Sequence, residues 1–325
     1  MGGSIAAVAG AALFANRRTA KTLLAPVLKQ REPPAGAGQW LSGMAVGAAG
    51  VRRWWLYRPP DAKFGERMPL MVMLHGCRQN ANLFATSTRM NAIAARERFL
   101  VLYPEQDRAA NAQGCWNWFD TSSGRAQGEA ASIMSAIEQV CVLYSADRDR
   151  IAVAGLSAGA SMAALLAIRQ PQRFKAVIMH SGIPPGTAHS TLSAMSAMHG
   201  GRSTRPLPPQ PALAGLPPLL VIHGREDSVV APGNGQAAVH VWAEAAGARG
   251  TAQRTVQRGA RYAAQVTDFK RRGSTAATLV EVATLGHAWS GGAAGQAYSD
   301  GQGPDASRMA WRFARRQFEE AGIGG

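Results

Sequence analysis

The sequence predicts an α/β fold in which a mostly parallel central sheet is covered by helices on both faces. Short apolar runs alternate with segments of helical periodicity from about Val51 to Phe313, and this alternation is typical of βαβ units with parallel strands. The chain has 325 residues, of which 46% are hydrophobic, enough to bury one large core. We therefore expect one globular domain over residues 49–325, preceded by an N-terminal extension over residues 1–48.

The expected elements follow one another in βα order. The expected strands cover residues 51–57, 70–74, 99–103, 151–154, 176–180, 219–223 and 278–284. The expected helices cover residues 86–98, 129–145, 158–169, 236–246 and 305–320. A Pro-rich loop is expected at 202–218, and the turn-prone segment 271–274 predicts a hairpin between 262–270 and the last strand.

The extension is rich in alanine and glycine and carries a Pro-Pro pair at residues 33–34, which is typical of a linker. No positive charge precedes its apolar stretch at residues 5–15, and Arg17 and Arg18 follow where a signal peptide would be cleaved. This stretch is either a weak export signal or a surface helix. No apolar run reaches the roughly 18 residues that span a bilayer, so we expect no transmembrane segment.

The formal net charge is +15 and comes almost wholly from arginine, because only five of the 35 basic residues are lysine. Nucleic acid is the first partner that such a charge suggests. No nucleic-acid-binding motif accompanies the charge, so we expect a solvated basic surface and no nucleic-acid partner. The three cysteines are too few for a disulfide-built scaffold, and Cys141 falls on an apolar helical stripe where a buried thiol is expected.

A candidate nucleophile lies in the segment 151–160, which is a short apolar strand, then Gly-x-Ser-x-Gly, then a helix of small residues. A serine hydroxyl is a poor nucleophile unless it projects from a sharp strand-to-helix turn toward a base. Gly155 and Gly159 leave room for such a turn around Ser157. The backbone N–H of Ala158, at the start of the helix, is a candidate donor to a developing oxyanion.

The base and its orienting acid are expected later in the chain, in the order Ser, acid, His. Of the seven histidines, His287 follows the last expected strand and is the candidate base. Asp227 follows the strand 219–223 and is the preferred acid, with Glu226 as the competitor. This order and the strand-turn-helix around the serine predict an α/β-hydrolase fold.

A second oxyanion donor is expected in the loop after the strand 70–74, which reads His-Gly-Cys-Arg-Gln at 75–79. Gly76 lets the backbone turn there. We expect the N–H of Cys77 to face that of Ala158, each donor being worth roughly 3 kcal/mol of the reaction barrier.

With these residues in place, the chain resembles the polyhydroxybutyrate (PHB) depolymerase family of esterases from about Val51 onward. Four segments carry the resemblance: Leu-His-Gly-Cys-Arg-Gln at 74–79, Tyr-Pro-Glu-Gln at 103–106 with Gly-Cys-Trp-Asn-Trp-Phe at 114–119, Gly-Leu-Ser-Ala-Gly at 155–159, and Gly-His-Ala-Trp-Ser-Gly-Gly at 286–292. One departure is Ala160, which stands where the family pattern has a second consecutive glycine.

The resemblance implies hydrolysis of esters of short hydroxyalkanoic acids through an acyl-enzyme, with no metal or organic cofactor. For many members it also implies secretion, which favours an extracellular or periplasmic location; the cytoplasm is the alternative because the signal-like stretch is malformed. Many secreted depolymerases of solid polymer carry a substrate-binding domain after the catalytic one, and we expect none after His287.

Two hypotheses concern the surroundings of the site. Cys77 and Cys115, near the two flanking loops, are candidates for a disulfide that holds the oxyanion loop. Trp116, Trp118 and Trp289 are candidates for the wall of an acyl pocket, because an aliphatic polyester offers mostly apolar surface; packing in the core is the alternative.

Two other functions compete with a PHB-type esterase. A feruloyl or acetyl esterase acting on plant polysaccharide would use the same catalytic residues, and the shape of the pocket would separate the two. A non-catalytic protein that binds polymer granules or membranes through its basic surface is disfavoured, because serine, acid and histidine all stand in the expected order.

Overall fold

The structure is a computed structural model that describes residues 34, 36–47, 50–200 and 215–323, the side chains of 321–323 excepted. The signal-like stretch 5–15 and most of the expected loop 202–218 lie outside these residues. Within the described part of the chain, no helix is both long and apolar enough to cross a membrane.

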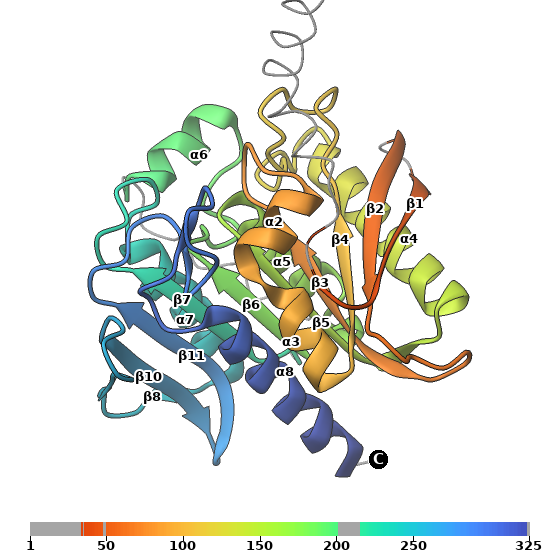
Figure 1. Cartoon of the computed structure of the whole chain (residues 1–325). Helices are drawn as coiled ribbons and strands as arrows, with labels where there is room; N and C mark the ends of the chain where they lie inside the picture. The colour runs from red at the N-terminus through yellow and green to blue at the C-terminus, as the bar shows by residue number, and fades with distance from the viewer. Residues whose placement is uncertain (1–33, 35, 48–49, 201–214, 324–325) are drawn as a thin grey trace, which may run out of the picture.

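One large sheet runs through the whole molecule (Figure 1). Its strand order is β1-β2-β4-β3-β5-β6-β7-β11-β10-β8, and β9 pairs beside β8 on β10. The strands are β1 (Gln39–Gly47), β2 (Gly50–Arg58), β3 (Met68–Leu74), β4 (Leu100–Pro104), β5 (Ala146–Leu156), β6 (Ala176–His180), β7 (Leu219–Gly224), β8 (Arg249–Gly250), β9 (Arg254–Val256), β10 (Ala264–Arg271) and β11 (Ser274–Val282). From β4 to β11 neighbouring strands are parallel, and antiparallel pairs stand at both edges.

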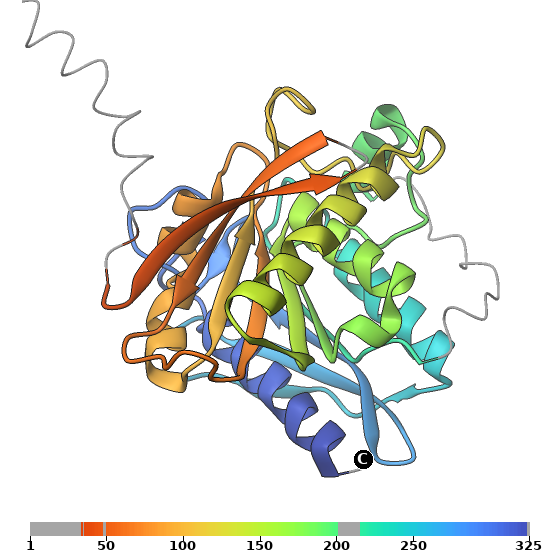
Figure 2. The ribbon, with the colours of Figure 1, turned by 90° about the vertical axis from the view of Figure 1, so that its right-hand side faces the viewer.

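Helices cover both faces of this sheet (Figures 1 and 2). The helices are α2 (Ala81–Thr88), α3 (Met90–Glu97), α4 (Arg125–Leu143), α5 (Ala158–Arg169), α6 (Thr191–Met198), α7 (Gly233–Ala246) and α8 (Ala306–Ile323), with a 3₁₀ turn at Pro171–Arg173. Helices α4, α5 and α7 pack on one face, while α2, α3 and α8 pack on the other. The expected α/β architecture is therefore confirmed.

Strand β3 shows how the sequence builds two cores from one sheet. Its side chains alternate between the two faces because successive residues of a strand point to opposite sides. Leu70, Val72 and Leu74 belong to the core under α4, α5 and α7, whereas Met71 and Met73 belong to the core under α2, α3 and α8. All five are fully buried. A strand without a polar side is typical of the centre of a parallel sheet.

The sheet begins at Gln39, earlier than the boundary that the sequence predicted at residue 49. Strand β1 pairs with β2 along its whole length, from Gln39 opposite Arg58 to Gly47 opposite Gly50. Its glycine- and alanine-rich sequence gives little strand signal, and most of its residues are exposed or half-buried. Part of the expected extension is therefore the edge of the main sheet.

The helix predicted at residues 86–98 is two helices, α2 and α3. They meet at Arg89, whose backbone is left-handed with φ 55°. Asn80 caps α2 by accepting a hydrogen bond from the N–H of Leu83 at 2.9 Å. The side chain of Arg89 donates to the carbonyl of Gly291 at 2.5 Å, so the break ties this helix pair to the loop that follows the expected histidine.

We predict that Trp40→Ala lowers the free energy of unfolding by about 2 kcal/mol, measured by urea denaturation of the full chain. The Trp40 ring stacks on Trp55 with centroids 5.6 Å apart, and its Nε1 donates to Asn82 Oδ1 at 3.1 Å. Phe64→Ala is the control, since Phe64 is fully exposed. A Trp40→Ala change below about 0.5 kcal/mol would contradict the pairing of β1 with the sheet.

Candidate active site

Ser157 stands at the turn between β5 and α5, as the sequence predicted. Its backbone has φ 57° and ψ −122°, a conformation that costs a non-glycine residue roughly 1–3 kcal/mol. Two backbone hydrogen bonds hold the turn: the N–H of Ser157 donates to the carbonyl of His180 at 2.9 Å, and its carbonyl accepts from the N–H of Ser161 at 3.1 Å. The serine is half-buried.

The two glycines of the motif are required by close contact between backbones. A Cβ atom on Gly159 would lie 2.1 Å from the carbonyl oxygen of Leu74, at the end of β3. A Cβ atom on Gly155 would lie 2.3 Å from the backbone of Gly159. Any larger residue at either position would push strand, turn and helix apart, and the serine with them.

Asp227 and His287 meet at the carboxyl ends of β7 and β11. The Nδ1 atom of His287 lies 2.8 Å from Oδ2 of Asp227. The other oxygen, Oδ1, accepts hydrogen bonds from the N–H groups of Val229 at 3.0 Å and Val230 at 2.8 Å. These three nitrogen atoms fix the orientation of the carboxylate, and the carboxylate in turn orients the imidazole of His287.

The surroundings keep Asp227 ionised. Burial alone would raise the pKa of its carboxyl, but contacts with His223 and His287 and the N–H of Val230 outweigh that effect and hold the pKa well below its usual range. The competitor for this role, Glu226, is exposed to solvent. The geometry therefore selects Asp227 as the acid that contacts the histidine.

The loop after β3 packs against the turn at Ser157. A Cβ atom on Gly76 would lie 3.5 Å from Cβ of Ser157, so the two segments are in van der Waals contact. Ala158 is the first residue of α5, where the backbone N–H has no partner within the helix. Among the described residues, the N–H of Cys77 has no hydrogen-bond acceptor. Neither of these two N–H groups, which the sequence suggested as oxyanion donors, has a hydrogen-bond acceptor in the described part of the chain.

A disulfide joins Cys77 to Cys115, with Cα atoms 4.3 Å apart. It links the loop after β3 to the segment between β4 and α4, which lie 38 residues apart in the sequence. The predicted pairing is confirmed. Cys141 is buried and free, as its position on the helical stripe predicted.

Glu129 anchors the segment that carries Cys115, a role that the sequence analysis did not identify. Its carboxylate is fully buried on α4. It accepts hydrogen bonds from Gln106 Nε2 at 2.8 Å and from the N–H and the side-chain amide of Asn117. Gln106 also donates to the carbonyl of Cys115 at 3.0 Å, and its N–H donates to His75 Nε2 at 3.1 Å. This network anchors the segment that carries Cys115 to helix α4.

The three tryptophans expected at an acyl pocket are all buried. Trp116 packs beside His75 and donates from Nε1 to its carbonyl at 3.1 Å. Trp289 has no exposed surface, and its Nε1 donates to Ser307 Oγ at 3.1 Å. Trp118 is 6% exposed. For Trp116 and Trp289 this burial favours the packing alternative, in which they support the two loops that flank the serine.

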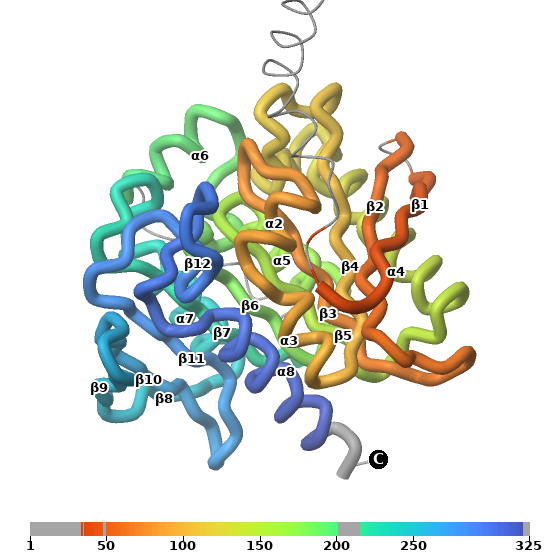
Figure 3. Tube along the Cα trace, viewed as in Figure 1, coloured from red at the N-terminus to blue at the C-terminus, as the bar shows by residue number. Residues whose placement is uncertain are grey.

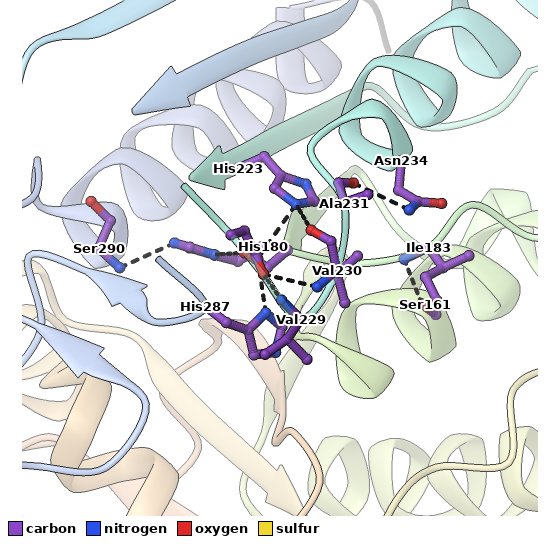
Figure 4. A network of polar contacts seen from close by, with 12 residues as sticks. Ser161, His180, Ile183, His223, Val229, Val230, Ala231, Asn234, His287 and Ser290 are labelled. Carbon is purple, nitrogen blue, oxygen red and sulfur yellow. Dashed lines mark hydrogen bonds and ion pairs between the residues drawn. The ribbon is translucent and has the colours of Figure 1, made fainter. Parts of the chain in front are cut away.

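Two further buried histidines lie beside the pair, as Figure 4 shows for His180, His223 and His287. His223 Nε2 lies 2.9 Å from the carbonyl of Val230 and 3.5 Å from Asp227 Oδ2. His180 Nε2 accepts from the N–H of Ser290 at 3.1 Å, and burial lowers its pKa to about 3, so it is neutral. The sequence did not single out His180 as part of this network.

Comparison with known proteins now adds to the geometry. The family model described as Esterase PHB depolymerase matches residues 53–258. The chain belongs to this family. It is 34% identical over 175 residues to a poly(3-hydroxyalkanoate) depolymerase C from Paucimonas lemoignei, an alignment that covers 51% of this chain and 42% of that protein. It is 26% identical over 203 residues to feruloyl esterase B from Neurospora crassa, covering 58% and 68% respectively. The chain thus spans less than half the length of the depolymerase.

Solved structures agree on the fold. An acetyl xylan esterase from Aspergillus awamori superposes with a TM-score of 0.63 at 18% identity, covering 78% of this chain and 94% of that one. A Ser161Ala mutant of LAE6, an α/β-hydrolase from the metagenome of Lake Arreo, superposes with a TM-score of 0.57 at 16% identity, covering 93% and 89%. The chain therefore has the α/β-hydrolase fold.

We predict that Cys115→Ser lowers the free energy of unfolding by about 2–4 kcal/mol, because the disulfide no longer restrains the unfolded chain. Urea denaturation checks this value, with Cys141→Ala as the control for loss of a thiol outside the disulfide. Thiol titration of the wild-type protein, denatured without reduction, should find one free thiol per chain. Three free thiols would contradict the pairing.

Proposed function

We propose that this protein is a serine esterase that cleaves esters of short hydroxyalkanoic acids, such as PHB or its oligomers, through an acyl-enzyme. The observation that carries the proposal is the hydrogen bond between His287 and Asp227 together with the strained backbone of Ser157. A serine in a strained conformation on a strand-to-helix turn presents its hydroxyl to a base. The catalytic unit we propose starts at Gln39, where the sheet begins.

In the first half of the proposed reaction, Ser157 Oγ attacks the ester carbonyl carbon and His287 takes the hydroxyl proton. Nδ1 of His287 is engaged by Asp227, so Nε2 is the nitrogen available to the serine. The imidazolium that forms is stabilised by the ionised carboxylate of Asp227. The ester carbon-oxygen bond then breaks, and the alcohol leaves with the proton from His287.

The negative charge that develops on the carbonyl oxygen is bound, in this proposal, by the N–H groups of Cys77 and Ala158. Both are backbone donors at fixed positions, so little reorganisation accompanies the reaction. In the second half of the reaction His287 removes a proton from water, the hydroxide attacks the acyl carbon, and the carboxylic acid leaves as Ser157 regains its proton.

The choice of substrate rests on family membership and on the depolymerase relative. No metal or organic cofactor enters the proposed mechanism, and no nucleic acid is proposed as a partner. The second candidate is a feruloyl or acetyl esterase, which the fungal feruloyl esterase favours. The two candidates share every catalytic step and differ in the acyl group.

We predict that Ser157→Ala and Asp227→Asn each lower kcat/KM for p-nitrophenyl butyrate by about a thousandfold or more. Alanine removes the nucleophile, while asparagine removes the charge that stabilises the imidazolium. Glu226→Gln is the matched control, since the neighbouring carboxylate is exposed and lies outside the hydrogen-bonded pair. Equal effects of Asp227→Asn and Glu226→Gln would remove Asp227 from the mechanism.

We also predict that the full chain releases 3-hydroxybutyrate from its soluble oligomers with a higher kcat/KM than it releases ferulate from methyl ferulate. Product release is measured by chromatography, with Ser157→Ala as the background. A preference for methyl ferulate would keep the mechanism and replace the substrate. If none of the esters is turned over faster than this background, the esterase proposal is refuted.

A further inference from the structure

A basic pocket of about 260 Å³ is lined by none of the residues of the proposed reaction. It is formed by β9, β10 and β11 together with α8 and the segment before it; Figures 1 and 3 show α8 beside this end of the sheet. None of its lining residues belongs to the serine turn, the histidine loop or the loop after β3. We call it the α8 pocket.

The floor of the α8 pocket is apolar. Val266 and Val280 come from neighbouring strands and are almost fully buried, and Met309 of α8 is half-buried beside them. Val256 on β9 completes this surface and is 39% exposed. Apolar side chains around a concavity favour a ligand with an aliphatic part.

The rim of the same pocket is cationic. Its four arginines are Arg258, Arg261, Arg308 and Arg312, against a single lining carboxylate, Asp305. An adjoining pocket shares two of these arginines and adds Arg96 and Arg315 with Glu97. Arginine presents several donors in a planar fork that fits a carboxylate or phosphate.

Several of these donors are not used by the protein itself. Among the described residues, neither Arg258 nor Arg312 forms an ion pair or a side-chain hydrogen bond. The Nε atom of Arg308 is buried without a hydrogen-bond partner in the described part of the chain, and its nearest carboxylate oxygen, in Asp305, is 4.0 Å away. A buried donor without a partner costs about 1–3 kcal/mol, which a bound anion would recover.

Arg261 is held in place at this rim. Its guanidinium donates to the carbonyl groups of Gly301 and Gly303, in the turn before α8. One arginine is thus fixed by the backbone while others have free donors, an arrangement in which little side-chain entropy is lost on binding.

We propose that the α8 pocket binds the carboxylate of a medium-length aliphatic acid. The carboxylate would lie among the arginines and the chain over Val266, Val280 and Met309. A purely hydrophilic anion would leave this apolar floor uncovered, and a neutral lipid would leave the guanidinium groups without a partner. The proposal does not depend on the proposed esterase activity, because no catalytic residue lines the pocket.

The test compares three probes by isothermal titration calorimetry on the full chain carrying Ser157→Ala, which prevents turnover. Octanoate has both the charge and the chain, octan-1-ol has the chain alone, and inorganic phosphate has the charge alone. Octanoate is expected to bind at least about tenfold more tightly than either, since each buried methylene adds roughly a factor of four. Equal affinity for phosphate would show only a basic surface and would overturn the proposal.

Variants locate the binding. Arg258→Ala combined with Arg312→Ala is expected to weaken octanoate at least about tenfold through the loss of charge-assisted hydrogen bonds. Arg169→Ala on α5, also exposed, is the matched control and should change nothing. Val256→Glu places a negative charge at an exposed position in the lining of the α8 pocket and should also weaken the binding of octanoate. Octanoate binding that is unchanged in both pocket variants, or absent in the parent, would refute the site.

The binding of octanoate is tested separately from catalysis. With Ser157 intact, the double arginine variant is expected to keep its rate on p-nitrophenyl butyrate within about twofold, because neither arginine contacts Ser157, Asp227 or His287 in the described part of the chain. A lost rate together with lost octanoate binding would indicate damage to the fold, and Val256→Glu then decides whether the pocket binds the anion.

Discussion

The candidate active site depends on three backbone segments that approach each other more closely than any side chain allows. At the turn between β5 and α5, Gly159 lies against the carbonyl of Leu74, and Gly155 lies against Gly159. This contact brings the end of β3 to the start of α5, so the loop with Cys77 lies beside Ser157. The strain at Ser157 is held by hydrogen bonds to β6 and α5. The strained turn at Ser157 persists because the paired strands around it hold its backbone in place.

Two buried carboxylates near the turn at Ser157 each have several hydrogen-bonding partners. Asp227 is satisfied by two histidines and two backbone N–H groups, and Glu129 by Gln106 and Asn117. Each carboxylate holds one of the loops that flank the serine. Buried charges of this kind are costly unless every partner is present. The two carboxylates fix the positions of the loops that they contact.

The sequence predicted what is encoded locally. The turn at Ser157 is one continuous segment, and the order serine, acid, histidine located Asp227 and His287 because each follows a strand. Other features depend on partners far along the chain. Strand β1 places Gly43 against the ring of Trp54 on β2. The large apolar side chain of this pair belongs to β2, so the residues of β1 alone do not predict a strand. His180 binds the N–H of Ser290, 110 residues later, and Arg89 binds the carbonyl of Gly291, 202 residues later. The α8 pocket likewise combines distant segments, and its arginines are spread too widely along the sequence to form a motif.

The central claim is that Ser157 is a nucleophile activated by its surroundings. The most direct measurement is to treat the full chain with a fluorophosphonate, digest it and locate the adduct by mass spectrometry. Our account predicts one adduct per chain, on Ser157, formed much more slowly in Asp227→Asn. Ser181 is the informative comparison, because it too has a positive φ, 51°, yet its side chain is fully buried. An adduct on another serine, or none under conditions in which the protein is folded, would contradict the account.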